Sequence, residues 1–181
     1  EGLLLEIKDY STLIVDNLYG GCRMADVMPT VNGVYVACTN LPGYQFPDGF
    51  SARVRVLGGD INNIYGGNDV TGTVYGGNAV AVYTSVRGDI YGGGNGAYPY
   101  TDNEKLADNS TFGDFYYNPG SSSTEALKAF RPNAEQVTIR LMGTELKPTV
   151  IKGSVYLGGN CSSLATKVAK PTVELKMESK I

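Results

Sequence analysis

The sequence predicts an all-β fold, a parallel β-helix (β-solenoid) interrupted by one irregular inserted loop. Three observations predict it. The 181-residue chain contains 24 Gly and 13 Tyr but no Trp and no His, which indicates that a recurring structural feature requires glycine. A short phrase ending in Tyr-Gly-Gly recurs along the chain. Several other segments alternate apolar and polar residues with the period of a strand.

The recurring phrase places an aliphatic residue and a tyrosine before a glycine-rich turn. Five copies keep the glycines, and a sixth has Val and Ala in their place. Residues at equal places in successive coils of a solenoid align, so we expect the tyrosines to form a structural stack at one corner. A ladder on which sugar rings stack is the alternative. The six tyrosines are Tyr19, Tyr35, Tyr65, Tyr75, Tyr91 and Tyr156.

The glycines and the asparagine that close most copies predict a sharp turn. Glycine adopts positive φ without a steric penalty, and asparagine tolerates the left-handed region better than most residues. Upstream of three copies, aliphatic residues alternate around a glycine, as in Val70, Gly72 and Val74. This spacing predicts a half-buried strand that leads into the turn.

A second type of strand is predicted from strict alternation of apolar and polar residues. The segments are 52–57, 137–142 and 173–177, with 5–8 as a further candidate. One coil then consists of an alternating strand, a short turn, a strand that ends in Tyr, and the glycine-rich corner. We therefore expect residues 1–181 to form a single solenoid domain whose coils share one apolar interior.

The repeat stops between Asn95 and Val137, and residues 96–136 are predicted to be an inserted loop with a short helix near 124–130. Two interpretations of its aromatic residues stand open. They bind a sugar or protein partner, or they pack down and cover a solenoid face. The acidic residues lack the spacing of a calcium loop, and we expect no metal and no cofactor. The candidate ligand-binding residues are Tyr98, Tyr100, Phe112, Phe115, Tyr116 and Tyr117.

Charge and residue types argue against several function classes. The chain has 18 acidic and 15 basic residues, a net charge of −3 and no dense basic run, so no nucleic-acid partner is expected. No stretch is long and apolar enough for a membrane span. Without histidine the Ser-His-Asp and Cys-His arrangements are impossible, and the carboxylates Asp60, Asp69 and Asp89 lie beside turns or on outward strand positions. We therefore expect no catalytic residues and no enzymatic activity.

Runs of the form G-x-(I/V)-Y-G-G-(G)-N, as in Gly88–Asn95, resemble those of large, repetitive, adhesin-like cell-surface proteins of gut bacteria. The resemblance covers residues 10–95 and 137–177. The sequence departs from the pattern at Leu157, which stands between the tyrosine and the two glycines. It implies an extracellular location on the surface of a bacterium and a longer parent chain of which this one is a piece. The expected partner is a host or microbial glycan or a surface protein.

The expected function is therefore that of a non-enzymatic extracellular surface scaffold, an adhesin-like solenoid module. A carbohydrate-binding accessory domain of a glycan-uptake system is the main alternative. A β-helix polysaccharide lyase or hydrolase that works with two carboxylates is a further, less favoured alternative.

Overall fold

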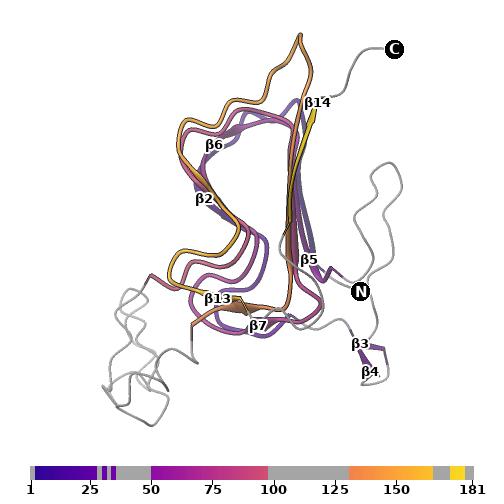
Figure 1. The fold of residues 1–181 in the computed structure, drawn as a ribbon, viewed down its shortest axis with the longest axis vertical. Coiled ribbons are helices and arrows are strands. Elements are labelled where there is room, and N and C mark those ends of the chain that lie inside the picture. Colours follow the sequence, from indigo (N-terminus) through magenta and orange to yellow (C-terminus); the bar gives the residue numbers. More distant parts are fainter. Residues whose placement is uncertain are drawn as a thin grey trace.

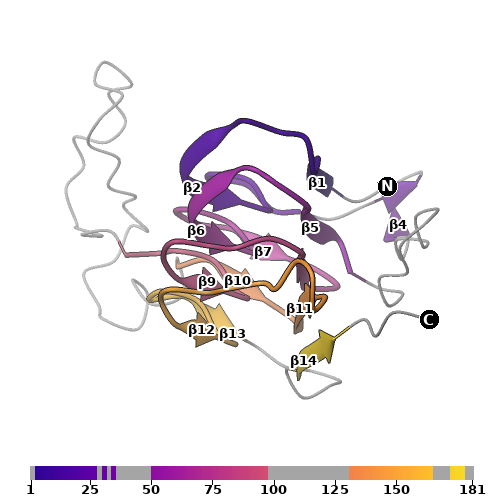
Figure 2. The ribbon, with the colours of Figure 1, turned by 90° about the horizontal axis from the view of Figure 1, so that it is seen from above.

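A computed structural model of the chain describes residues 3–27, 30–31, 34–35, 50–97, 131–164 and 172–177. Every regular element in these ranges is a β-strand. Most strands belong to three parallel sheets (Figures 1 and 2), and one short antiparallel pair, β3 (Thr30–Val31) with β4 (Val34–Tyr35), lies to the side of them. The prediction of an all-β chain with parallel strands is confirmed, and the arrangement is compatible with a parallel β-helix.

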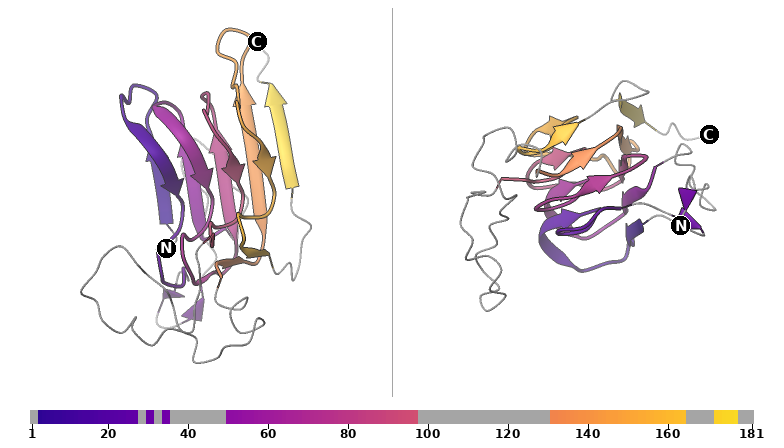
Figure 3. Two further views of the ribbon diagram at one scale, coloured as in Figure 1. Left: turned by 90° about the vertical axis from the view of Figure 1, so that its left-hand side faces the viewer. Right: turned by 90° about the horizontal axis from the view of Figure 1, so that it is seen from below.

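The first sheet joins the alternating strands that the sequence predicted, and adds one that it did not. Figure 3 shows its parallel strands side by side. The added strand alternates Ala with Val, both of which count as apolar, so it gave no two-residue pattern; all five of its residues are buried. The order is β1 (Leu3–Ile7), β5 (Ala52–Val56), β8 (Asn78–Val82), β11 (Val137–Gly143) and β14 (Thr172–Met177).

The other two sheets complete a circuit. The second sheet has the order β2 (Ile14–Tyr19), β6 (Asp60–Tyr65), β9 (Ile90–Tyr91) and β12 (Val155–Tyr156), and the third has β7 (Thr73–Val74), β10 (Asn133–Ala134) and β13 (Ser163–Leu164). The chain visits the first, second and third sheets in turn and returns to the first beside its previous strand (Figures 1 and 2). Each circuit therefore lies on the one before it.

The end of the segment assigned to the inserted loop, 96–136, is part of these sheets. Strand β10 pairs in parallel with β7, Asn133 opposite Thr73 and Ala134 opposite Val74. Ala134 is only 1% exposed and belongs to the shared interior. The predicted helix near 124–130 lies outside the described residues.

Aliphatic side chains from all three sheets fill one interior. Val54, Val80 and Ile139 occupy the same position on adjacent strands of the first sheet and are at most 1% exposed. Burying a Val or Ile side chain stabilises a fold by about 1.5–3 kcal/mol, so this interior is the largest stabilising contribution. The fully buried aliphatic side chains are Ile61, Ile64, Ile90, Ile139, Val54, Val56, Val70, Val74, Val80, Val82, Val86 and Val137.

The glycines after two of the tyrosines have a different role from the predicted one. Gly66 and Gly92 are not among the residues with positive φ. A Cβ atom on Gly66 would lie 2.4 Å from the carbonyl oxygen of Gly92, so glycine is required because successive circuits touch there. Only the copy with Gly76 and Gly77 has the predicted positive φ, 78° and 97°.

The asparagine that closes the phrase is likewise not left-handed. Asn68 is 1% exposed and has no positive φ. Its Nδ2 donates to the carbonyl oxygens of Ala25 (2.9 Å) and Thr71 (3.1 Å). Its Oδ1 accepts from the backbone N–H of Cys22 (2.7 Å). One amide thus satisfies three backbone groups in two circuits, which explains its place in the turn.

We expect Val74→Asp to lower the free energy of unfolding by about 3–5 kcal/mol, because it forces an unpaired carboxylate into the interior. Val74 has no exposed surface and packs with Val27 and Ala52. Chemical denaturation followed by circular dichroism measures the change. Ile14→Asp is the control, since Ile14 is 75% exposed. An unchanged midpoint for Val74→Asp would contradict the placement of β7.

We also expect Gly76→Val to destabilise the fold more than Thr73→Val. Gly76 has a φ of 78°, which costs a β-branched residue about 1–3 kcal/mol. Thr73 lies in strand β7, where valine is favoured. The melting temperatures of the two variants measure this difference. Equal values would contradict a turn at Gly76 that requires positive φ.

Candidate functional site

The second sheet carries a column of stacked tyrosines, which we call the tyrosine ladder: Tyr19, Tyr65, Tyr91 and Tyr156. They end β2, β6, β9 and β12 and lie in register. Neighbouring ring centroids are 4.9 Å apart, with interplanar angles of 11°, 2° and 11°. This separation equals the spacing of paired strands, about 4.7–4.9 Å. The stack therefore follows from the strand register without distortion.

Two of the six tyrosines that the repeat grouped together lie elsewhere. Tyr75 follows β7 of the third sheet, and its backbone N–H donates to the carbonyl oxygen of Val27 (3.0 Å). Tyr35 ends β4 in the antiparallel pair. The phrase around Tyr75 contains the same residue types as the ladder copies, so the local sequence does not reveal that it forms a different corner of the circuit.

Stacking restricts what the ladder can bind. Tyr65 and Tyr91 each have a ring on both faces, and a sugar ring packs on the face of an aromatic ring rather than on its edge. Tyr65 is 6% exposed, whereas Tyr156 at the end of the ladder is 46% exposed. The geometry therefore favours the structural interpretation of the ladder over the carbohydrate-stacking one.

A polar column runs beside the ladder, two residues before each tyrosine. The Nδ2 of Asn63 donates to the Oδ1 of Asn17 (3.0 Å), and the Oδ1 of Asn63 accepts the backbone N–H of Asp89 (2.9 Å). The Oδ1 of Asp89 in turn accepts the N–H of Ser154 (2.7 Å). Each circuit is thereby bound to the next through side chains, in addition to the strand pairing. A bond of this kind contributes about 0.5–1.5 kcal/mol.

The hydroxyls of the two central ladder tyrosines, Tyr65 and Tyr91, resist ionisation. Burial raises the pKa of Tyr91 to about 12, and the hydrogen bond that its hydroxyl donates to the Oδ2 of Asp89 (3.1 Å) adds to the rise. Burial also raises the pKa of Tyr65, although a hydrogen bond with Asn160 works in the opposite direction. Both phenols therefore remain neutral at physiological pH, so that no charge opposes the stacking of the rings.

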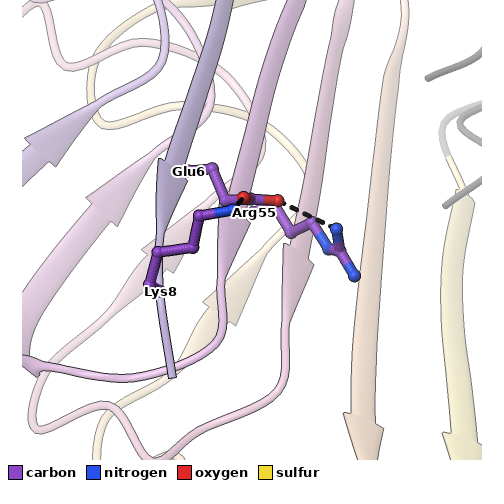
Figure 4. A network of polar contacts seen from close by, with 3 residues as sticks. All are labelled: Glu6, Lys8 and Arg55. Carbon is purple, nitrogen blue, oxygen red and sulfur yellow. Dashed lines mark hydrogen bonds and ion pairs between the residues drawn. The ribbon is translucent and has the colours of Figure 1, made fainter. Parts of the chain in front are cut away.

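Charged side chains occupy the outer face of the first sheet. Glu6 accepts hydrogen bonds from Lys8 and from the Nη1 of Arg55 (2.8 Å; Figure 4). The bond from Lys8 is the largest of the effects that lower the pKa of Glu6; burial opposes it, and Arg55 adds to it. The same bond raises the pKa of Lys8. Arg55 also lies over the ring of Tyr83, with its Cζ 5.6 Å from the centroid, so this aromatic ring is fixed on the sheet surface.

A hollow of about 210 Å³, which we call the exit hollow, lies where the strands of the first sheet end. Its apolar walls are Leu57, Tyr83 and Met142, each of which follows one of the paired residues Val56, Val82 and Leu141. Residues from four circuits therefore line one small site. The complete lining is Asp9, Leu57, Tyr83, Met142, Gly143, Thr144 and Lys147.

One wall of the exit hollow is built by a strand, β11, that runs past its neighbour β8. β11 continues to Gly143, although the last residue of β8 pairs with Leu141, and the following loop projects beyond the other circuits (Figures 1 and 3). The loop turns through paired backbone hydrogen bonds between Thr144 and Lys147 (3.1 and 3.2 Å). The Nζ of Lys147 donates to the carbonyl oxygen of Leu57 (3.3 Å), two circuits away.

The exit hollow was not predicted from the sequence, although a signal was present. Leu57 and Met142 each continue an alternating strand at the position where a polar, outward-facing residue is expected. The aromatic residues that were predicted to bind a ligand lie outside the described residues: Tyr98, Tyr100, Phe112, Phe115, Tyr116 and Tyr117.

Comparisons of the chain with protein families, with curated proteins and with solved structures give no match. Within the ranges that the structure describes, no helix is long and apolar enough to cross a membrane.

We expect the stability to fall as the pH rises from about 10 toward 12. The pKa of Tyr91 in the folded chain, about 12, lies above its ordinary value of 10.0. Below pH 10 both states hold the proton and stability is unchanged; between the two values only the unfolded chain loses it, which favours unfolding. Melting temperatures across this range should fall less steeply in Tyr91→Phe than in wild type.

Tyr10→Phe is the matched control, since Tyr10 is 80% exposed and outside the ladder. This variant should follow the wild-type curve. If Tyr91→Phe follows it as well, burial of the Tyr91 hydroxyl contributes nothing to the loss of stability at high pH.

Proposed function

We propose that the chain is a β-solenoid segment that serves as a non-enzymatic, adhesin-like scaffold on the outside of a bacterial cell. The observation that carries this proposal is the tyrosine ladder with its polar column, in which equivalent side chains of four circuits bind one another. Repeats that contact mainly their neighbours form an elongated body that grows by adding repeats. Such a body suits a spacer that holds a binding surface away from a cell.

The carboxylates considered for a polysaccharide lyase or hydrolase are engaged in holding circuits together. Asp89 accepts the N–H of Ser154 and the Tyr91 hydroxyl. Asp60 is paired with Arg87, and Asp69 accepts the Nδ2 of Asn95 (3.0 Å). These carboxylate oxygens already bind partners within the protein, so they are less free to exchange a proton with a substrate. These contacts support a scaffold rather than an enzyme.

The resemblance to adhesin-like repeat proteins adds the location and the partner to this proposal. Concave and loop-built surfaces of stacked repeats are the parts that bind partners. The charged side chains on the outer face of the first sheet, such as Glu6, Lys8 and Arg55, include both signs, so this face does not select a strongly charged partner. We take a cell-surface glycan as the partner.

The test exposes the purified chain to an array of mammalian and microbial glycans, and to pectin and glycosaminoglycans in solution. We expect retention on a subset of the array, with no release of reducing ends or unsaturated products. Boiled protein is the control and should not be retained. Product release would overturn the non-enzymatic role, and failure to bind any glycan would overturn the adhesin-like one.

A further inference from the structure

We propose that the exit hollow is a carbohydrate subsite that takes a short stretch of a neutral glycan. This inference deepens the proposed adhesin-like function, and rests on it for its biological setting. The site itself is argued from the described side chains, namely an apolar floor, a rim of polar groups and a loop that is held in place.

The floor is apolar at positions where the outer faces of β5 and β11 are otherwise polar. The residues directly before Leu57 and Met142 face the interior. The residues two positions before them, Arg55 and Arg140, lie on the outer face of the sheet. At the ends of the strands, three adjacent circuits instead place Leu57, Tyr83 and Met142 against the hollow. A concave site with an apolar floor and a few polar groups is the usual form of a small-molecule site.

The rim offers the hydrogen-bonding groups that a sugar requires. The carboxylate of Asp9 accepts bonds from hydroxyls, the ammonium of Lys147 donates them, and the hydroxyl of Thr144 does both. A pyranose has apolar C–H faces and a periphery of hydroxyls, which matches an apolar floor below a polar rim. The two charges have opposite signs, so an ionic ligand attracted by one is repelled by the other. The lining therefore favours a neutral sugar.

The direction of the hollow fits a chain of sugars rather than a single compact ligand. Its lining comes from four successive circuits, Asp9 from the first and Lys147 from the fourth. Paired strands are about 4.8 Å apart, and Leu57, Tyr83 and Met142 come from three adjacent strands, so the hollow extends along the stack across neighbouring circuits. A glycan lying along the stack would meet the side chains of a new circuit with each unit.

The loop that forms the wall is fixed before any ligand arrives. The Thr144–Lys147 turn is closed by two backbone hydrogen bonds, and Thr144 Oγ1 accepts the N–H of Lys147 (3.0 Å). Thr149 Oγ1 donates to the carbonyl oxygen of Met142 at the base of the loop. A preformed wall lowers the entropic cost of binding, which favours a weak ligand such as a neutral sugar.

The experiment titrates the full chain with cellobiose, maltose, lactose and N,N′-diacetylchitobiose, and follows backbone amide signals by NMR. We expect at least one disaccharide to shift the signals of Leu57, Tyr83 and Thr144. Asp9→Asn and Lys147→Gln should each weaken that binding about tenfold, the effect of losing one hydrogen bond to a charged group. Both positions are exposed, so the fold should tolerate the changes.

The matched controls are Asp16→Asn and Lys152→Gln, which change an exposed acid and an exposed lysine on the side of the second sheet. They should bind as wild type does. Unchanged affinity in Asp9→Asn and Lys147→Gln would overturn the subsite, as would loss of binding in Tyr156→Ala instead, which would move the ligand to the end of the ladder.

The titration and the array separate the two proposals. Retention on the array without shifts at the exit hollow overturns the subsite and leaves the adhesin-like function standing. Failure of both the array and the titration overturns both.

Discussion

The close parallel stacking of circuits is the constraint on which the other features depend. Paired strands lie about 4.8 Å apart, and at this distance the backbone of Gly66 meets that of Gly92 with no room for a Cβ atom. The same spacing brings tyrosine rings into face-to-face contact at 4.9 Å. It also places Asn63 within reach of the circuits on both sides. The spacing between circuits thus explains why glycine, tyrosine and asparagine recur together in the repeated phrase.

The apolar interior and the ladder contribute in different ways. Burial of aliphatic side chains supplies most of the stabilisation, since each one contributes about 1.5–3 kcal/mol, whereas an ion pair near the surface such as Glu6–Arg55 contributes at most about 1 kcal/mol. The ladder contributes mainly to register. A slip by one residue would turn Ile64 and Ile90 out of the interior and would also break the alignment of Tyr65 with Tyr91.

The sequence predicted those strands whose outer face carries polar residues. Alternation identified β5 and β11 because arginine and threonine mark their outer faces. It missed β8, whose outward residues Ala79 and Ala81 are fully buried beside Phe50. The tyrosine phrase identified the positions that stack, but it also grouped Tyr75 with them. Strand partners and backbone angles separate that copy from the others, and neither is encoded by the residue types of a single phrase.

Apart from the apolar residues Leu57 and Met142, the candidate site left no signal in the sequence, because it arises where the circuits differ rather than where they repeat. A position in the ladder is constrained by its neighbours on both sides, so its chemistry is largely used in stacking. The ends of the first-sheet strands carry no such constraint: β11 runs past β8, and its turn brings Lys147 over Leu57. An array of similar circuits therefore gains a distinct site only where one of them departs from the repeat. Because that departure involves residues far apart in sequence, it becomes visible only once the strands are placed in register.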